Sequence, residues 1–219
     1  MKKLLAFLKI LLLYIFLFIL AEILRQAIIY FIVPVRHPFF SLRSSLFPFR
    51  GLISGIFAMV FLLFLTKKNT KIDIYNYFKK IDPIILLITI GAAIILNLIF
   101  TFEKVFLTGT ILNLPDTKEI LFTGRIISPF LEEIFFRGFM LASFYKTTNN
   151  FVLSAILSSL LFSLVHFNIM DPYLPILIST FALGLITCYL MIKYKNLWYC
   201  IAFHFTYNFM VWITLTGIN

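Results

Sequence analysis

The chain has 219 residues, of which 62% are hydrophobic and 13% are charged. Soluble domains typically have about 45–50% apolar and about 25% charged residues, so a water-soluble fold is excluded because too few charges remain to cover the apolar surface. The formal net charge is +10, with 19 Lys and Arg residues against 9 Asp and Glu residues. These cations are spread over several short loops, which favours the cytoplasmic loops of a membrane protein and no nucleic-acid partner.

Seven apolar runs are long enough to cross a hydrocarbon layer of about 30 Å. They predict an all-α fold, a polytopic transmembrane helix bundle of about seven spans, with six or eight as alternatives. The first run follows Lys2 and Lys3 but is too long for a signal peptide, so we expect an uncleaved span. The runs are Leu4–Val33, Leu46–Thr66, Pro83–Phe102, Ile120–Tyr145, Phe151–Phe167, Leu174–Ile192 and Trp198–Thr216.

The loop cations predict the orientation of the chain in the membrane. With the N-terminus in the cytoplasm, eleven basic residues lie on the cytoplasmic side and five on the other side, as the positive-inside rule expects. The basic cytoplasmic loop near 67–82 mixes lysines with apolar residues, which predicts either an interfacial amphipathic helix or a solvated loop. The eleven are Lys2, Lys3, Lys9, Lys67, Lys68, Lys71, Lys79, Lys80, Lys146, Lys193 and Lys195, and the five are Arg36, Arg43, Arg50, Lys104 and Lys118.

The run at 120–145 carries the densest group of ionisable residues. Such groups are costly in hydrocarbon, so each one needs a partner or a function. Glu133 and Arg137 are four residues apart on a helix, so their charges can pair. Glu132 is rotated by about 100° from Glu133 and lacks that partner, which suits a general base or acid. Pro129 predicts a kink just before the two carboxylates.

Two later runs carry histidines. His166 follows Phe162 by one helical turn on the fifth run, and His204 precedes Asn208 by one turn on the seventh. A lone membrane histidine is more often a helix-to-helix hydrogen bond than a catalyst. If the helices converge, however, Glu132, the two histidines and Asn208 share one polar cavity, which the sequence leaves open.

These three motifs, in this order and on separate hydrophobic segments, resemble those of the CPBP family. Its members are the CAAX proteases and bacteriocin-processing enzymes, also called the Abi or type II CAAX prenyl endopeptidase family. The resemblance divides the chain into N-terminal transmembrane helices at 1–119 and a CPBP-like catalytic helix core at 120–219, within one integral membrane domain. The matches are EExxxR at Glu132-Glu133 and Arg137, FxxxH at Phe162 and His166, HxxxN/D at His204 and Asn208, and a weaker one at Phe181-Ala182-Leu183-Gly184.

The resemblance implies an intramembrane endopeptidase. Glu132 would activate a water molecule that attacks the scissile carbonyl, with His166 positioning the water or sharing its proton. His204 and Asn208 would donate hydrogen bonds to the oxyanion. Glu133 and Arg137 would orient the site or hold the substrate backbone, and Phe162 belongs to the supporting motif.

The implied substrate is a membrane-associated peptide or protein, processed in peptide maturation, bacteriocin self-immunity or signalling. The abundance of Lys, Ile, Asn and Phe is typical of an AT-rich bacterial genome, so we expect the protein in a bacterial cell membrane.

The same resemblance allows a metal. Glu132, His166 and His204 would give zinc a His₂Glu ligand set with one open position. The sequence lacks the HExxH spacing that fixes two ligands on one helix, so a metal-free mechanism without a cofactor is favoured. Cys188 and Cys200 lie in apolar runs without a metal-binding spacing and are predicted to be core residues rather than a disulfide.

Two other function classes compete with the protease. In a proton-coupled transporter, Glu132, Glu133 and the histidines would form a proton relay. In a non-catalytic membrane scaffold or immunity protein, these polar residues would only tie helices together. A scaffold should tolerate Glu132→Gln, whereas a protease should not.

Overall fold

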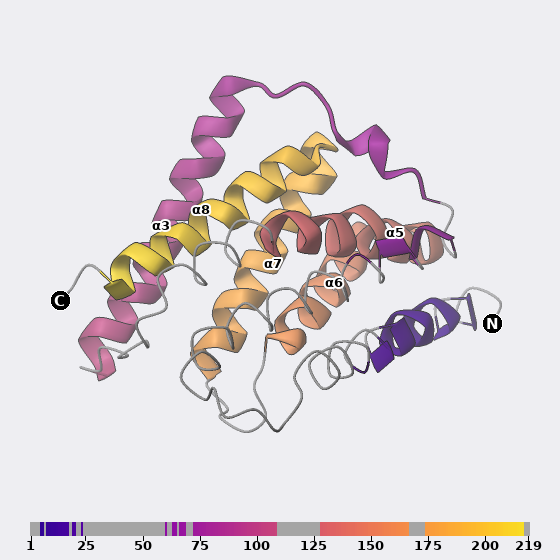
Figure 1. The fold of residues 1–219 in the computed structure, drawn as a ribbon, viewed down its shortest axis with the longest axis horizontal. Helices are drawn as coiled ribbons and strands as arrows, with labels where there is room; N and C mark the ends of the chain where they lie inside the picture. The colour runs from indigo at the N-terminus through magenta and orange to yellow at the C-terminus, as the bar shows by residue number, and fades with distance from the viewer. Residues whose placement is uncertain are drawn as a thin grey trace, which may run out of the picture.

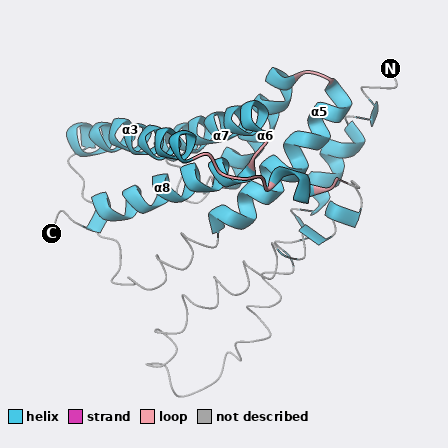
Figure 2. Ribbon diagram, turned by 90° about the horizontal axis from the view of Figure 1, so that it is seen from above, coloured by secondary structure: helices cyan, strands magenta, loops and turns pink. Residues whose placement is uncertain are grey.

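The computed structural model describes residues 72–108, 128–166 and 174–216, together with separate residues within 5–23 and 60–68. All regular structure in this part of the chain is helical, as the sequence predicts (Figure 2). The named elements are the 3₁₀ turn η1 (Ile74–Tyr77), α3 (Pro83–Thr108), the π-helix η2 (Ile134–Leu141), α5 (Ala142–Thr148), α6 (Phe151–Val165), α7 (Leu174–Tyr194) and α8 (Leu197–Thr216).

Two of the described helices are long and apolar enough to cross a membrane. These are the first eighteen residues of α3, Pro83–Phe100, and the whole of α7, Leu174–Tyr194. Leu8–Leu17 and Phe151–Val165 form shorter apolar helices. Most of the run at 46–66 and much of the run at 4–33 lie outside the described residues, so the predicted number of about seven spans is not confirmed.

The helices turn apolar side chains outward and polar side chains inward. On α3, Ile84 and Leu87 are exposed by 70% and 68%, whereas Asn97 is buried. On α6, Val152 is 69% exposed, while every serine of the helix is buried. Such an arrangement suits a lipid environment, because lipid favours apolar surface and leaves polar groups to pair inside the bundle.

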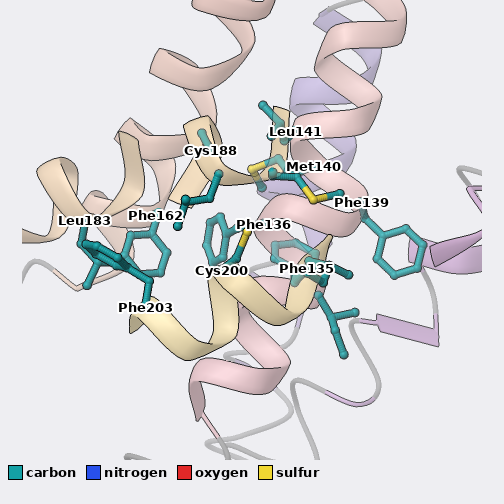
Figure 3. Close-up of a cluster of buried hydrophobic side chains, with 14 of the residues drawn as sticks. Phe135, Phe136, Phe139, Met140, Leu141, Phe162, Leu183, Cys188, Cys200 and Phe203 are labelled. Atoms are coloured by element: carbon teal, nitrogen blue, oxygen red, sulfur yellow. The ribbon is translucent and has the colours of Figure 1, made fainter. Parts of the chain in front are cut away.

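The buried core surrounds η2, all of whose residues are buried. Figure 3 shows Phe136, Phe162 and Cys200 close together within this cluster. Cys188 and Cys200 are both buried free thiols, which confirms the prediction that they are core residues. The core therefore lies against the segment that carries the predicted catalytic carboxylates.

The segment before α3 is described from residue 72 onward, and most of its residues are exposed. Within 72–82 it contains one helical turn, η1, whose first residue follows an N-cap made by Asp73. The ring of Phe78 then packs edge-on against Trp198 at a centroid distance of 5.2 Å. The Asn196 side chain donates to the carbonyl oxygens of Lys79 and Lys80 at 3.4 and 3.3 Å. These contacts attach the segment 78–80 to the start of α8.

Two tight turns set the helical hairpins of the second half. Asn149, with φ 53°, ends α5 in the left-handed conformation, and the side chain of Asn150 caps the start of α6. Lys195, with φ 49°, makes the equivalent turn between α7 and α8. A left-handed residue is a common way to end a helix, and Asn adopts that conformation more readily than most residues.

Candidate active site

The predicted carboxylates stand where a helix changes its geometry. Residues 128–133 are α-helical, and the helix continues as the π-helix η2 and then as α5. Single π-helical turns inside α-helices are often found at functional sites. The hydroxyl of Ser158 on α6 donates to the carbonyl oxygen of Phe136 in η2 at 3.1 Å. This bond satisfies a buried carbonyl and attaches η2 to α6.

Glu133 is the centre of a buried polar network that joins three helices. Its Oε2 lies 3.1 Å from Nε of Arg137, and both side chains are completely buried. Its Oε1 lies 2.9 Å from Nδ1 of His204 on α8. Arg137 also donates from Nη2 to the carbonyl oxygen of Gly184 on α7 at 3.3 Å. The ion pair predicted from the four-residue spacing is therefore present.

Phe162 packs against Arg137 of this network and against both histidines. Its ring lies under the guanidinium of Arg137, with 4.5 Å from Cζ to the ring centroid. The same ring contacts the imidazoles of His166 and His204 at centroid distances of 4.6 and 5.5 Å. A cation over an aromatic face is stabilised without a competing hydrogen bond. Phe162 thus holds the arginine and both histidines in place.

Glu132 turns away from Glu133, as its rotation around the helix predicts, and faces both histidines. The hydroxyl of Ser128, one turn earlier, donates to Oε1 of Glu132. Oε2 lies 3.6 Å from Nε2 of His166 and 4.0 Å from Nε2 of His204. Among the described residues, no hydrogen-bond donor reaches this buried Oε2. Glu132 and both histidines therefore converge on one point.

Hydrogen bonds to Nδ1 fix the orientation of both imidazoles. Nδ1 of His166 lies 2.8 Å from the carbonyl oxygen of Phe162, which can only accept, so Nδ1 carries a proton. Nδ1 of His204 donates in the same way to the Glu133 carboxylate. In the neutral form of each ring, the unprotonated Nε2 then faces Glu132. Such partners commonly set the tautomer of a functional histidine.

Exposure differs sharply among the three converging side chains. The side chain of His166 is 32% exposed, that of Glu132 is 13% exposed and that of His204 is 3% exposed. Asn208 lies one turn after His204 on α8 and is half-buried. The site is therefore partly exposed at His166 and buried at His204.

In the described part of the chain, no three His, Cys, Asp or Glu side chains are arranged so that they could hold a metal ion. Glu132, His166 and His204 nevertheless carry the donor types of a His₂Glu zinc set. The kink predicted at Pro129 depends on residues 120–127, which lie outside the described residues.

Three contributions to the site were missed in the sequence. The bond from Ser128 to Glu132 follows from a four-residue helical spacing, so that spacing could have revealed it. The bond between His204 and Glu133 depends on how α8 packs against η2, for which a single sequence carries no signal. The acceptor at Gly184 is a backbone carbonyl, and only the weak match at 181–184 pointed toward it.

Residues 119–210 match the family model described as type II CAAX prenyl endopeptidase Rce1-like. This range contains the three motifs of the resemblance, with both carboxylates, both histidines and Asn208. No curated protein and no solved structure matches the chain. The family match implies a protease, and together with the apolar helices it indicates an integral membrane protein.

Proposed function

Because residues 119–210 form an Rce1-like domain, we propose that this protein is an intramembrane endopeptidase. It hydrolyses a peptide bond of a membrane-associated peptide or protein in a bacterial cell membrane, with its N-terminus in the cytoplasm. Peptide maturation and bacteriocin self-immunity are the roles that this activity would serve.

One observation carries the proposal. The buried Oε2 of Glu132 faces Nε2 of both His166 and His204 at 3.6 and 4.0 Å. A water molecule bound between these three atoms would have a carboxylate and two imidazole nitrogens as partners. A purely structural carboxylate would instead be paired directly, as Glu133 is with Arg137.

Glu132 acts as the general base in this mechanism. It takes a proton from the water as the water oxygen attacks the scissile carbonyl, and His166 positions that water through Nε2. The carboxyl group of Glu132 then gives the proton to the leaving amine. General acid–base catalysis of this kind accelerates a reaction by about 10²–10⁴-fold.

His204 and Asn208 stabilise the oxyanion of the tetrahedral intermediate. The carboxylate of Glu133 accepts a hydrogen bond from Nδ1 of His204, and the doubly protonated ring donates from Nε2 to the oxyanion. Each preorganised donor is worth about 3–4 kcal/mol in such sites. Glu133 and Arg137 act as positioning residues, because they hold His204 without facing the reacting atoms.

The test compares the peptides of membranes that contain the wild-type chain or Glu132→Gln. The amide keeps the shape of the carboxylate but cannot take a proton, so cleavage products found with the wild type should disappear. Asp73→Asn is the matched control, because this exposed N-cap residue of η1 undergoes the same acid-to-amide change outside the site.

The products decide between the competing functions. Unchanged products in a folded Glu132→Gln variant would refute the protease and favour a scaffold. Ion flux into vesicles that Glu132→Gln abolishes, with no cleavage by the wild type, would favour a transporter.

A further inference from the structure

We infer that Ser128 is a positioning residue of the proposed reaction. Its hydroxyl occupies one oxygen of the Glu132 carboxylate, so that the other oxygen, Oε2, takes the proton from the water and returns it to the leaving amine. This inference rests on the proposed function and adds a residue that lies outside the three motifs of the resemblance.

The first step is the local geometry that brings the two side chains together. Ser128 lies four residues before Glu132 in the α-helical stretch 128–133, so the two side chains are neighbours on the helix surface. An ionised carboxylate can only accept hydrogen bonds, so the hydroxyl donates and Oε1 accepts. A hydrogen bond to an ionised group is stronger than one between neutral groups. Ser128 therefore holds Oε1 toward the preceding turn of the helix.

The second step is the difference between the two oxygens of Glu132. Oε1 accepts from Ser128, whereas among the described residues no hydrogen-bond donor reaches the buried Oε2. Oε2 instead lies 3.6 Å from Nε2 of His166 and 4.0 Å from Nε2 of His204. A carboxylate oxygen that already accepts a hydrogen bond attracts a proton less strongly than an oxygen without a donor. Oε2 is therefore the oxygen that takes the proton.

The third step is the rotation that the serine prevents. The terminal torsion of a glutamate side chain is broad and roughly two-fold, so an unrestrained carboxylate exchanges its two oxygens. The bond at Oε1 restrains this torsion and keeps Oε2 toward the two histidines. The same helix continues into η2, which lies against α6, α7 and α8 (Figure 1). The base is therefore oriented before a substrate binds.

The direction of its bond separates Ser128 from hydroxyl groups that serve the helices themselves. Thr89, Thr147 and Ser154 each donate to the carbonyl oxygen four residues earlier, at 2.7, 2.8 and 2.7 Å. Bonds of that kind pair a hydroxyl with the backbone of its own helix. Ser128 donates in the other direction along the chain, to a carboxylate that faces both histidines. Its hydroxyl is thus placed to orient a functional group.

The proton follows a closed path through Oε2. As the water oxygen bonds to the scissile carbonyl carbon, one water proton moves to Oε2 of Glu132, and an electron pair of the carbonyl double bond moves to its oxygen. When the intermediate collapses, the carbon–nitrogen bond breaks with its electron pair on nitrogen, and nitrogen takes the proton from Oε2. The carbonyl re-forms, and the new carboxyl group loses the second water proton to solvent. Ser128 keeps its own proton throughout.

The experiment compares Ser128→Ala and Ser128→Thr in the purified full chain. Alanine removes the hydroxyl, and threonine keeps it. Ser154→Ala is the matched control, because it removes a buried hydroxyl that donates to the carbonyl oxygen of Asn150, more than three helical turns before His166 on α6. Thermal unfolding in detergent establishes that each variant is folded.

The first measurement needs no substrate. In protein whose glutamates carry carbon-13 at the side-chain carboxyl, the NMR resonance of Glu132 is the one that Glu132→Gln removes. We expect Ser128→Ala to move this resonance, and Ser128→Thr and Ser154→Ala to leave it near its wild-type position. An unchanged resonance in folded Ser128→Ala would overturn the inference.

The second measurement is kinetic and uses a peptide that the wild type cleaves and Glu132→Gln does not. We expect Ser128→Ala to lower kcat about tenfold with KM within about twofold of the wild type, because Ser128 bonds the base and not the substrate. Ser128→Thr should restore kcat to within about threefold of the wild type, and Ser154→Ala should lower stability without lowering kcat.

The outcomes separate this inference from the proposed function. Wild-type kcat in folded Ser128→Ala, with Glu132→Gln inactive, would overturn the positioning role alone. A low kcat that folded Ser128→Thr does not restore would overturn it too. A wild-type chain that cleaves no peptide would refute the proposed function, and the positioning role with it. If Ser128→Thr does not fold, Ser128→Ala and its control still decide.

Discussion

Glu132 and Glu133 are neighbours in the sequence, but their carboxylates have opposite surroundings. Glu133 is completely buried between Arg137 and His204, at 3.1 and 2.9 Å. Glu132 accepts from the Ser128 hydroxyl and otherwise faces the Nε2 atoms of the two histidines. The first arrangement neutralises a buried charge, and the second leaves an oxygen free to accept a proton.

We predict that Glu133→Gln and Arg137→Met each destabilise the protein by about 3–5 kcal/mol, because each change leaves the other charge buried without compensation. Thermal unfolding in detergent measures the effect. The double replacement Glu133→Leu with Arg137→Met should be more stable than either single variant, although it should remain inactive. Single variants with wild-type stability would show that the pair is not needed for folding.

We expect substitutions of the two histidines to have similar effects on activity but different effects on stability. His166→Ala removes a partly exposed ring whose Nδ1 hydrogen-bonds a backbone carbonyl, so we expect loss of cleavage with a loss of stability of about 1 kcal/mol or less. His204→Ala also leaves a buried oxygen of Glu133 without its donor, which should cost about 1–3 kcal/mol in addition to activity. Unfolding curves beside cleavage assays test both. Equal destabilisation by the two changes would contradict the assigned burial.

At the scale of elements, α6 and α7 approach closely because small residues face each other. A Cβ added to Gly184 would lie 2.9 Å from Cβ and 3.0 Å from Cα of Ser159, and this Gly184 also supplies the carbonyl that accepts from Arg137. Small residues at helix interfaces are a common way to bring membrane helices together. The contact therefore sets the packing of α7 against α6 and the position of one hydrogen-bond acceptor of the buried Arg137.

We predict that Gly184→Ala destabilises the protein by about 1–3 kcal/mol through overpacking and lowers activity by moving the carbonyl that holds Arg137. Gly91→Ala on α3 is the matched control, because its Cβ would meet no atom within 4 Å. That change should be neutral or stabilising by up to about 1 kcal/mol, since Ala is the better helix former. Differential scanning fluorimetry distinguishes the two. An equally tolerated Gly184→Ala would argue against the close contact.

At the scale of the whole molecule, the lengths of the apolar runs predicted the long helices of the part of the chain that the structure describes. The start of α3 at Pro83, the start of α6 at Phe151 and the start of α7 at Leu174 agree with the predicted runs. The starts at Pro83 and Phe151 follow polar caps at Asp82 and Asn150, whose side chains accept from the first backbone N–H groups. Local signals of this kind are visible in the sequence.

The three-dimensional site was only partly predictable. The pairing of Glu133 with Arg137 is local to one helix, so its spacing revealed it. The second bond of Glu133, to His204, joins residues 71 positions apart and depends on packing between helices. The π-helix η2 was also missed, because its geometry is set by contacts such as the bond from Ser158. The family motifs, and not the spacing within any one helix, indicated that Glu132, His166 and His204 belong to one site.

The zinc content of the whole molecule distinguishes the metal-free mechanism from the zinc alternative. We predict that the purified protein keeps its activity after strong chelation and contains no stoichiometric zinc, because the proposed mechanism uses both Nε2 atoms for the water and the oxyanion. Metal analysis beside a cleavage assay measures this. About one zinc per chain, lost in His166→Ala and His204→Ala, together with inhibition by chelators that added zinc reverses, would make these residues ligands instead.

The most direct test of the account is a single turnover of an identified substrate in water labelled with heavy oxygen. If Glu132 acts as the general base, the label should enter the new carboxyl group of the product, Glu132 should remain unlabelled, and Glu132→Gln should give no product. Label in the Glu132 side chain, with an unlabelled product, would instead make this residue a nucleophile. Cleavage by Glu132→Gln at the wild-type rate would contradict the central claim.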